Sequence, residues 1–220
     1  MSIQERFVLF REDGVLKLKD LERPKYKPIY IDFGEYLSHW DHQKSSLKNA
    51  LLAKAIGFKG EPLTVWDSTL GLAKDAFFFC LLGCKVTGTE RSETIFSLLK
   101  DALERAKSDK KVYSIVENLE IYNCDALEID KDNFDVIYID PMYPDTKSSA
   151  APQASMQILR DLLVTENNIH NLIDFAQKKA NLRVVIKRPP KARPVDRPLI
   201  HSYSGKSVRY DAYRPSNRTW

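Results

Sequence analysis

From residue 62 onward the sequence alternates short apolar runs with amphipathic stretches, and this alternation constrains the fold more than any other feature. The pattern predicts strands over residues 63–67 and 85–90 and an apolar helix over 73–82 between them. Further along it predicts a helix capped by Ser92 and strands near 119–123, 134–140 and 183–187. Strands and helices that alternate with short connections favour right-handed βαβ units and a parallel sheet.

The N-terminal part of the chain has a different rhythm. Residues 7–21 alternate around Glu12-Asp13-Gly14, which predicts a β-hairpin, and residues 28–33 predict another short strand. Helical spacing over 44–57 predicts a helix that ends at Gly57. We therefore expect a β-rich appendage over 1–35, a linking helical region over 36–61 and the main domain over 62–220. Residues 189–198 are too rich in proline for regular structure, and residues 208–213 alternate as a terminal strand.

Composition narrows the class of protein. With 220 residues, 43% of them hydrophobic, the chain can bury one full core. No apolar run reaches the roughly 18 residues needed to cross a bilayer, and the first residues lack a secretory layout, so we expect a cytoplasmic protein. Three cysteines without C-x-x-C spacing predict reduced thiols, and we expect no metal site.

Positive charge is concentrated near the C-terminus. The net charge is only +4, yet residues 178–220 hold twelve Lys or Arg against two acids. A one-sided positive field is typical of a protein that binds a polyanion such as nucleic acid, although an ordinary solvated surface explains it about as well.

The stretch V-I-Y-I-D-P-M-Y-P over residues 136–144 marks the predicted functional edge. Its uninterrupted apolar run predicts a strand buried on both faces, which ends at Asp140. Open α/β sheets bind ligands at the carboxyl ends of their strands.

The turn after the first parallel strand, D-S-T-L-G-L-A-K-D over residues 67–75, predicts a donor site. It has one glycine where a pyrophosphate site needs G-x-G-x-x-G, and Asp75 would repel a phosphate. S-adenosylmethionine (SAM), which is cationic and phosphate-free, fits better than a nicotinamide cofactor, the less favoured alternative. Acids at successive strand ends can then bind SAM. Glu90 can accept hydrogen bonds from the ribose hydroxyls, and Asp125 can accept one from the adenine amino group.

The acceptor side is predicted from Asp140-Pro141-Met142-Tyr143. This run resembles the Asp/Asn-Pro-Pro-aromatic signature of amino methyltransferases, with Met142 in place of the second proline. The Asp140 carboxylate and the Pro141 carbonyl can each accept an N–H of an exocyclic amine, and Tyr143 can stack on the base. We expect basic residues beyond the next strand to hold RNA phosphates: Lys187, Arg188, Arg193, Arg197 and Arg209.

Several motifs together resemble a known family, the bacterial 16S ribosomal RNA guanine-N2 methyltransferases of the small, single-domain type (RsmJ-like). They are D-S-T-L-G-L-A-K-D-A, G-C-K-V-T-G-T-E-R, Y-I-D-P-M-Y-P, R-V-V-I-K-R-P and V-R-Y-D-A-Y. The resemblance implies a Rossmann-like class I methyltransferase: a three-layer sandwich with a mostly parallel seven-stranded sheet and an antiparallel C-terminal strand. It further implies SAM as donor and a guanine of the small ribosomal subunit as target.

The same resemblance implies the donor contacts Lys74, Asp75, Glu90, Arg91, Asp125, Ala126 and Asp140, to which the turn adds Asp67, Thr69 and Gly71. Two departures stand out. The family usually has Gly-Leu-Gly-Arg-Asp where this chain has Gly71-Leu72-Ala73-Lys74-Asp75, and a glycine-rich, Arg-containing segment where this chain has residues 42–48. A catalytically silent relative that binds ribosomal RNA is therefore the main alternative to an active enzyme.

Overall fold

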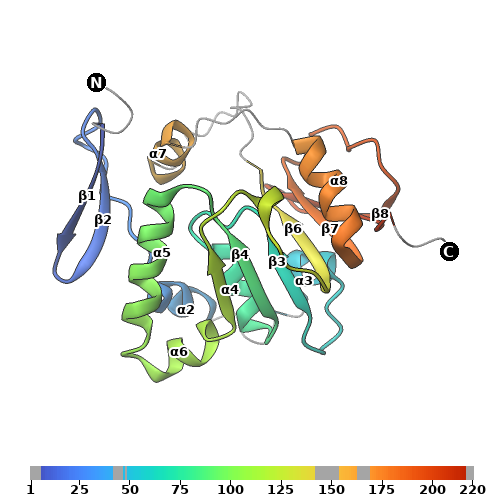
Figure 1. Ribbon diagram of the computed structural model, residues 1–220, viewed down its shortest axis with the longest axis horizontal. Helices are drawn as coiled ribbons and strands as arrows, with labels where there is room; N and C mark the ends of the chain where they lie inside the picture. Colours follow the sequence, from blue (N-terminus) through green and yellow to red (C-terminus); the bar gives the residue numbers. More distant parts are fainter. Residues whose placement is uncertain (1–5, 42–46, 48, 142–153, 163–168, 217–220) are drawn as a thin grey trace.

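A computed structural model of the protein describes residues 6–41, 47, 49–141, 154–162 and 169–216 (Figure 1). The strands are β1 (Phe7–Glu12), β2 (Val15–Asp20), β3 (Thr64–Asp67), β4 (Lys85–Thr89), β5 (Leu119–Tyr122), β6 (Phe134–Ile139), β7 (Ala180–Arg188), β8 (Leu199–Ser204) and β9 (Arg209–Tyr213). The helices are α2 (Phe33–Asp41), α3 (Leu51–Ile56), α4 (Lys74–Leu81), α5 (Glu93–Ala106), α6 (Lys110–Val116), α7 (Ala154–Leu162) and α8 (Ile169–Lys179), with a 3₁₀ turn, η2, at Ala126–Glu128.

Seven strands form the central sheet in the order β5-β4-β3-β6-β7-β9-β8. The pairs from β5 through β7 are parallel, whereas β9 runs antiparallel to both β7 and β8. This arrangement confirms the predicted fold class, including the single antiparallel strand near the C-terminus. From β3 the chain adds β4 and β5 on one side, and β6 then returns to the other side of β3. The strand order therefore switches between β3 and β6, which is where ligands bind in sheets of this type.

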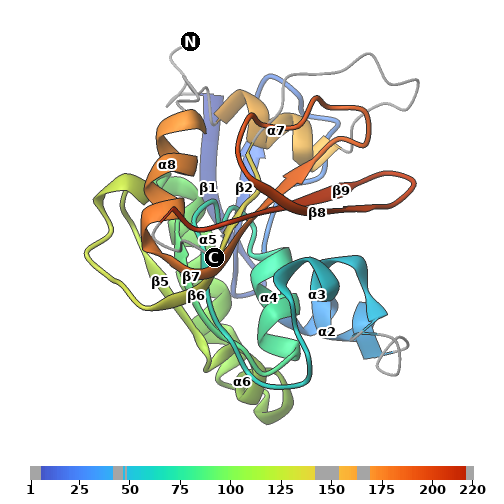
Figure 2. The ribbon, with the colours of Figure 1, turned by 90° about the vertical axis from the view of Figure 1, so that its right-hand side faces the viewer.

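Helices cover both faces of the sheet and make three layers. On one face, side chains of α3, α4, α5 and α6 share a core with Val65, Val136 and Val185 of the strands. On the other face, Ile173 and Ala176 of α8 pack on Ile137, Val184 and their neighbours. Strand side chains alternate between the faces, so each central strand contributes to both cores. The hairpin of β8 and β9 extends beside α3, which packs against both strands (Figure 2).

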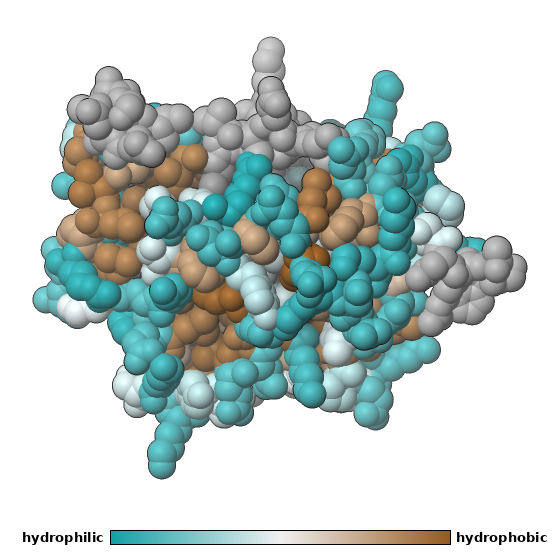
Figure 3. Space-filling model, viewed as in Figure 1, coloured by the Kyte–Doolittle hydropathy of each residue, from teal (hydrophilic) through white to brown (hydrophobic). Residues whose placement is uncertain are grey.

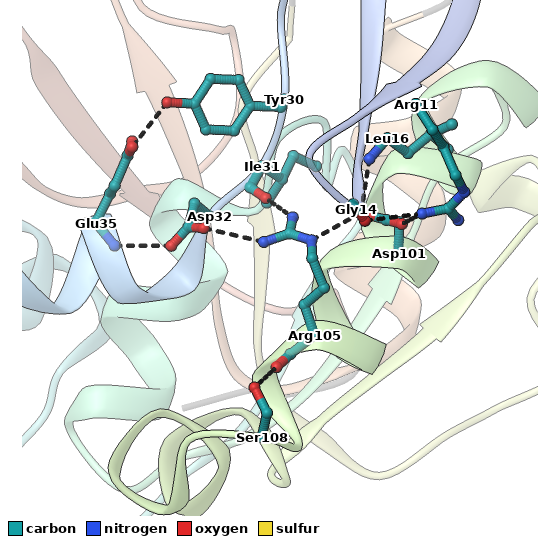
Figure 4. Close-up of polar contacts among 10 residues, drawn as sticks. All are labelled: Arg11, Gly14, Leu16, Tyr30, Ile31, Asp32, Glu35, Asp101, Arg105 and Ser108. Atoms are coloured by element: carbon teal, nitrogen blue, oxygen red, sulfur yellow. Dashed lines mark hydrogen bonds and ion pairs between the residues drawn. The ribbon is translucent and has the colours of Figure 1, made fainter.

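The predicted N-terminal hairpin is present as β1 and β2, and a polar network ties it to α5 (Figure 4). The buried carboxylate of Asp101 accepts bonds from the Arg11 guanidinium at 2.7 Å and the Leu16 backbone N–H at 3.2 Å. Arg105 donates to Asp101 at 2.8 Å and to Asp32, just before α2, at 2.9 Å. Phe7 and Leu18 join the same buried cluster as the helices. The division at residue 35 stays a prediction.

A second set of ion pairs ties the hairpin to α7. Arg6 bonds Asp20 at 2.6 Å and Asp161 of α7 at 2.6 Å, and Arg23 also bonds Asp161 at 2.9 Å. Outside these contacts the hairpin carries exposed apolar side chains, Val8, Leu9 and Leu21, and brown atoms gather over this side of the molecule (Figure 3).

One expected element was wrong, and other elements were not expected. Residues 28–33 make one isolated bridge, Leu18 to Ile29, instead of a strand, and α2 begins at Phe33. Helix α6 and edge strand β8 were not expected. The helix expected over 44–57 is α3, described only from Leu51, because residues 42–46 and 48 lie outside the described part of the chain.

Candidate active site

The predicted site residues converge at one edge of the sheet, where the parallel strands end. Asp67 is the last residue of β3, Glu90 follows β4, and Asp140 follows β6. The register pairs Asp67 with Tyr138 and Ile139 with Ile186 of β7, so these ends are nearly level. The carboxyl ends of the parallel strands therefore place the three acids at one edge of the sheet.

The turn between β3 and α4 lies over the end of β4. Gly71 has a φ of 52° and donates its backbone N–H to Glu90 Oε2 at 3.0 Å, while the Leu70 N–H donates to the Thr89 carbonyl at 3.1 Å. Ala73 has a φ of 57°. A left-handed conformation costs a residue with a Cβ about 1 kcal/mol, so Ala73 is a strained position at the start of α4.

Glu90 is held rigidly at the end of β4. It is 6% exposed, and its second carboxylate oxygen accepts the Ser92 backbone N–H at 2.7 Å. Burial raises the pKa of Glu90, although the Ser92 and Gly71 N–H groups oppose the shift. Each carboxylate oxygen has a second lone pair, so Glu90 can still accept hydroxyl donors such as those of a ribose.

Asp75, Asp140, Tyr138 and Lys187 form a cluster in front of β6 and β7. The Lys187 ammonium donates to Asp75 Oδ2 at 2.8 Å and to Asp140 Oδ2 at 2.9 Å. The buried Tyr138 hydroxyl donates to the same Asp75 oxygen at 2.6 Å. The backbone N–H of Asp140 donates to Thr69 Oγ1 at 2.7 Å, which connects the end of β6 to the turn between β3 and α4.

Burial and neighbouring charges shift the pKa values of this cluster. Burial raises the pKa of Asp140 to about 6, with Asp75 adding to the rise and the Lys187 charge opposing it. Burial also raises the pKa of Asp67 well above its usual value, and Asp75 adds to that rise. Burial opposes the charged form of Lys187, but Asp75 and Asp140 outweigh it and raise the pKa of Lys187, which keeps the ammonium charged at neutral pH.

The other predicted donor contacts surround this edge. Asp125 follows β5 and caps η2, since its Oδ1 accepts the Leu127 N–H at 2.9 Å. Ala126 is half-buried, and Lys74 and Arg91 are exposed at the starts of α4 and of the segment before α5. Pro141 is buried. Met142, Tyr143 and Pro144 lie outside the described residues.

This set of side chains fits SAM better than a phosphate-containing cofactor. Its acids, Asp67, Asp75, Glu90 and Asp140, suit a ligand with sulfonium and ammonium charges. A pyrophosphate needs free N–H groups on the turn. Here the N–H groups of Thr69, Leu70 and Gly71 donate to Asp67, Thr89 and Glu90 instead.

The predicted RNA contacts have different surroundings. Arg193 is exposed, whereas Arg197 bonds Asp174 at 2.8 Å and Arg188 donates to the Arg193 carbonyl. Arg209 is 9% exposed, and its guanidinium bonds both oxygens of the fully buried Asp211 at 2.8 Å. Lys187 bonds the two acids described above.

Several side chains that contact the acid cluster were not predicted from the sequence. Tyr138, Tyr210 and the Lys187 bridge were not expected, because their positions depend on strand register and on contacts between distant residues. Tyr210 faces the cluster from β9, and burial, with Asp75 adding to it, raises its pKa. Its partner in register is Lys187, which places the two side chains on one face of the sheet.

The described residues offer neither a metal site nor a membrane-spanning helix. Within those ranges, no group of three or more His, Cys, Asp or Glu side chains is placed to hold a metal ion. No helix in the described part of the chain is both long and apolar enough to span a membrane.

The sheet order, the antiparallel β9 and the acids at the carboxyl edge define a class I SAM-dependent methyltransferase. The sequence matches the SAM_MT family, described as "Putative SAM-dependent methyltransferase", over residues 2–215. This chain belongs to that family.

Relatives and a solved structure agree with this assignment. Ribosomal RNA small subunit methyltransferase J of Coxiella burnetii is 38% identical over 223 residues, which cover 98% of this chain and 87% of the relative. The protein of the same name from Desulfotalea psychrophila is 37% identical, covering 86% of this chain and 75% of the relative. The crystal structure of a SAM-dependent methyltransferase from Neisseria gonorrhoeae superimposes with a TM-score of 0.75 at 27% identity, over 96% of this chain and 84% of that one.

Proposed function

We propose that this protein transfers a methyl group from SAM to the exocyclic N2 amine of a guanine in 16S ribosomal RNA, in the cytoplasm. The observation that carries the proposal is the Asp140 carboxylate, held beside Asp75 by Lys187 at the edge where the donor turn ends. The names of the relatives supply the class of substrate, small-subunit ribosomal RNA. The guanine N2 position comes from the family resemblance of the Asp140-Pro141-Met142-Tyr143 run.

The donor would be held by acids at successive strand ends. Glu90 accepts the ribose hydroxyls, and Asp125 accepts the adenine amino group beside the Ala126 backbone. Asp67 and Asp75, with Thr69 and Gly71 of the turn, face the cationic end, while Lys74 and Arg91 border the site. When bound, SAM supplies a methyl group that is already activated by its bond to a positively charged sulfur. After transfer, that sulfur would be part of a neutral thioether, the leaving group.

Asp140 and Pro141 prepare the acceptor. An exocyclic amine is a poor nucleophile because its lone pair is delocalised into the base. The Asp140 carboxylate and the Pro141 carbonyl each accept one N–H, which turns the nitrogen lone pair toward the methyl group and stabilises the positive charge that develops on nitrogen. Asp140 then takes the proton that the amine loses. Tyr143, outside the described residues, is proposed to stack on the base.

The C-terminal cations are proposed to hold the phosphates. Arg193 is the best placed, because it is exposed. Arg188 and Arg197 remain candidates whose present partners would have to be shared with a phosphate. Arg209 bonds a buried carboxylate, so we assign it to the structure of the β8–β9 hairpin, and we assign Lys187 to the acid cluster.

Transfer of radiolabel tests the proposal. The protein is incubated with tritiated SAM and either small subunits or naked 16S RNA from a strain that lacks the gene. We expect label in N2-methylguanosine. Measurable SAM binding without label in any form of the RNA would refute the proposal and favour the catalytically silent relative. Titration calorimetry with NAD separates the nicotinamide alternative, which requires tight NAD binding and no SAM binding.

A further inference from the structure

Lys187 joins the donor and acceptor halves of the site. Its ammonium lies between Asp75 on α4, the donor side, and Asp140 after β6, the acceptor side, at 2.8 and 2.9 Å. Its side chain is 30% exposed, so it is half-buried in the site and not extended into solvent like a phosphate-binding lysine. A lysine that bonds two carboxylates at once fixes the distance between them.

The strand register explains why Lys187 reaches both acids. In β7, Ile186 pairs with Ile139, so Lys187 comes level with Asp140 where β6 ends. On the other side, Lys187 pairs with Tyr210 of β9, whose ring is buried against the same face. The Tyr138 hydroxyl donates to the same Asp75 oxygen at 2.6 Å. Strands on two sides and a helix therefore confine the ammonium.

We propose that Lys187 is a positioning residue for methyl transfer, which holds the Asp140 carboxylate in the orientation that receives the target amine. The inference rests on the proposed function, because it names how the acceptor side of that site is set. By bonding one carboxylate oxygen, Oδ2, the ammonium leaves the other, Oδ1, to accept the amine N–H.

Other charges around Asp140 decide what the loss of Lys187 would do. Asp67 from β3, Asp75 from α4, Tyr138 from β6 and Tyr210 from β9 interact with Asp140, and Asp75 adds to the rise in its pKa. Lys187 is the cation that opposes this rise. Without it, repulsion from the acids raises the pKa of Asp140 further and lets its side chain turn away from Asp75.

The test compares Lys187→Met and Lys187→Arg with wild type by steady-state kinetics across pH. We expect Lys187→Met to lower kcat by about 10- to 100-fold with little change in KM for RNA. Its loss of activity at acid pH should begin about one pH unit higher. Lys187→Arg keeps the charge, so its acid limb should stay near that of wild type. A raised KM with unchanged kcat would instead show a phosphate contact and overturn the proposal.

Lys179→Met is the matched control. Lys179 also bonds a carboxylate, Asp132 at 2.6 Å, and its side chain is 17% exposed. This pair, however, lies where β6 and β7 begin, at the opposite end of these strands from Asp140 and Lys187. We expect its kcat and acid limb to match those of wild type. Circular dichroism checks that each variant is folded. A folded Lys187→Met protein with the wild-type acid limb would overturn the proposal.

A titration without RNA separates this inference from the proposed function. With ¹³C-labelled aspartate, the Asp140 carboxyl resonance is assigned by its absence in Asp140→Asn, and its midpoint is followed with pH. We expect a midpoint near 6 in wild type and Lys187→Arg, and a higher one in Lys187→Met. Equal midpoints in all three would refute the inference even if methyl transfer is observed. The expected shift without methyl transfer to any RNA would refute only the proposed function.

Discussion

Asp140 is positioned by its backbone as well as its side chain. The backbone N–H bonds the hydroxyl of Thr69 in the donor turn, and one carboxylate oxygen bonds Lys187. Because both ends of the residue are held, the remaining carboxylate oxygen has a defined direction. Such a preorganised acceptor stabilises developing charge without reorganising during the reaction.

Replacing Asp140 separates its two roles. Asp140→Ala removes both the N–H acceptor and the proton acceptor, so we expect kcat to fall by about 10²- to 10³-fold. Asp140→Asn keeps a carbonyl oxygen and should retain more activity than the alanine variant. Methyl transfer to 16S RNA and filter binding of that RNA measure the two properties. We expect unchanged RNA affinity in both variants. Equal kcat in Asp140→Ala and wild type would contradict the proposed role of Asp140 in accepting the amine.

At the scale of elements, the N-terminal hairpin is fastened to α5 by the network in Figure 4. Asp101 receives three donors there, and its side chain is 4% exposed. Arg105 lies at the centre of the network, where its guanidinium donates to Asp101 at 2.8 Å and to Asp32 at 2.9 Å. A buried carboxylate that loses a partner pays a desolvation penalty, so this contact matters more than a surface pair.

Arg105→Ala should destabilise the protein by about 2 kcal/mol, because Asp101 would keep Arg11 but lose its other guanidinium partner. Urea unfolding at pH 7 measures the change in the free energy of unfolding. Lys107→Ala, two residues further along the chain, is the control, since its pair with Glu104 is largely exposed and should contribute less than about 1 kcal/mol. The structural role of Arg105 would be contradicted if both variants lost equally little stability.

Asp20 predicts how the hairpin responds to acid. Its hydrogen bonds with Arg6 lower the pKa of this carboxyl, whose side chain is fully buried. A carboxyl with a lowered folded pKa stabilises the fold above its unfolded pKa, and this contribution is lost as the pH falls through the folded value. Asp20→Asn should therefore be about 1–3 kcal/mol less stable than wild type at pH 7.

The difference between Asp20→Asn and wild type should shrink as the pH falls below about 4, where the unfolded Asp20 begins to gain its proton. Urea unfolding at a series of pH values follows it. Glu104→Gln, at an exposed position, provides the comparison and should show little dependence on pH. A constant gap between Asp20→Asn and wild type down to pH 2 would rule out this linkage.

Most elements could be predicted from the sequence, and the misses have physical reasons. Helix α5 was found because its apolar stripe is long and Ser92 caps it, its Oγ accepting the Ile95 N–H. Helix α6 was missed because it is short and buries only Val112 and Val116. Strand β8 was missed because it lies at the sheet edge, where Leu199 and Ile200 remain exposed and the alternation is weak. For the site, acids at strand ends were predictable, whereas the contact of Lys187 with Asp75, 112 residues away, depends on tertiary packing.

At the scale of the whole molecule, charge is divided unevenly along the chain. Asp67, Glu90 and Asp140 lie at the carboxyl ends of the parallel strands, and the excess of Lys and Arg lies in residues 178–220. Such a division favours a cationic donor at one place and a polyanion at another. Binding of RNA should then weaken as salt rises, because bound phosphates release counterions.

Arg193→Ala should weaken RNA binding and reduce the slope of log affinity against log salt by about one. Arg193 is exposed, and Arg188 bonds its backbone carbonyl, which alanine retains, so the fold should be unchanged. Fluorescence anisotropy with labelled RNA at several salt concentrations gives the slope. Lys107→Ala, just after α5, serves as a comparison. An unchanged slope in Arg193→Ala would exclude a phosphate contact at this position.

The level ends of β3 and β6 limit which sequence changes this family can accept. Asp67 pairs with Tyr138, and successive strand side chains point to opposite faces. Inserting or deleting one residue inside β6 would turn the Tyr138 hydroxyl toward α8 and Asp140 away from Lys187. Apolar residues in β6 can replace one another, and surface loops can change length. The number of residues from Phe134 to Asp140 cannot change in the same way. We therefore expect relatives to preserve that number even where their residues differ at each position.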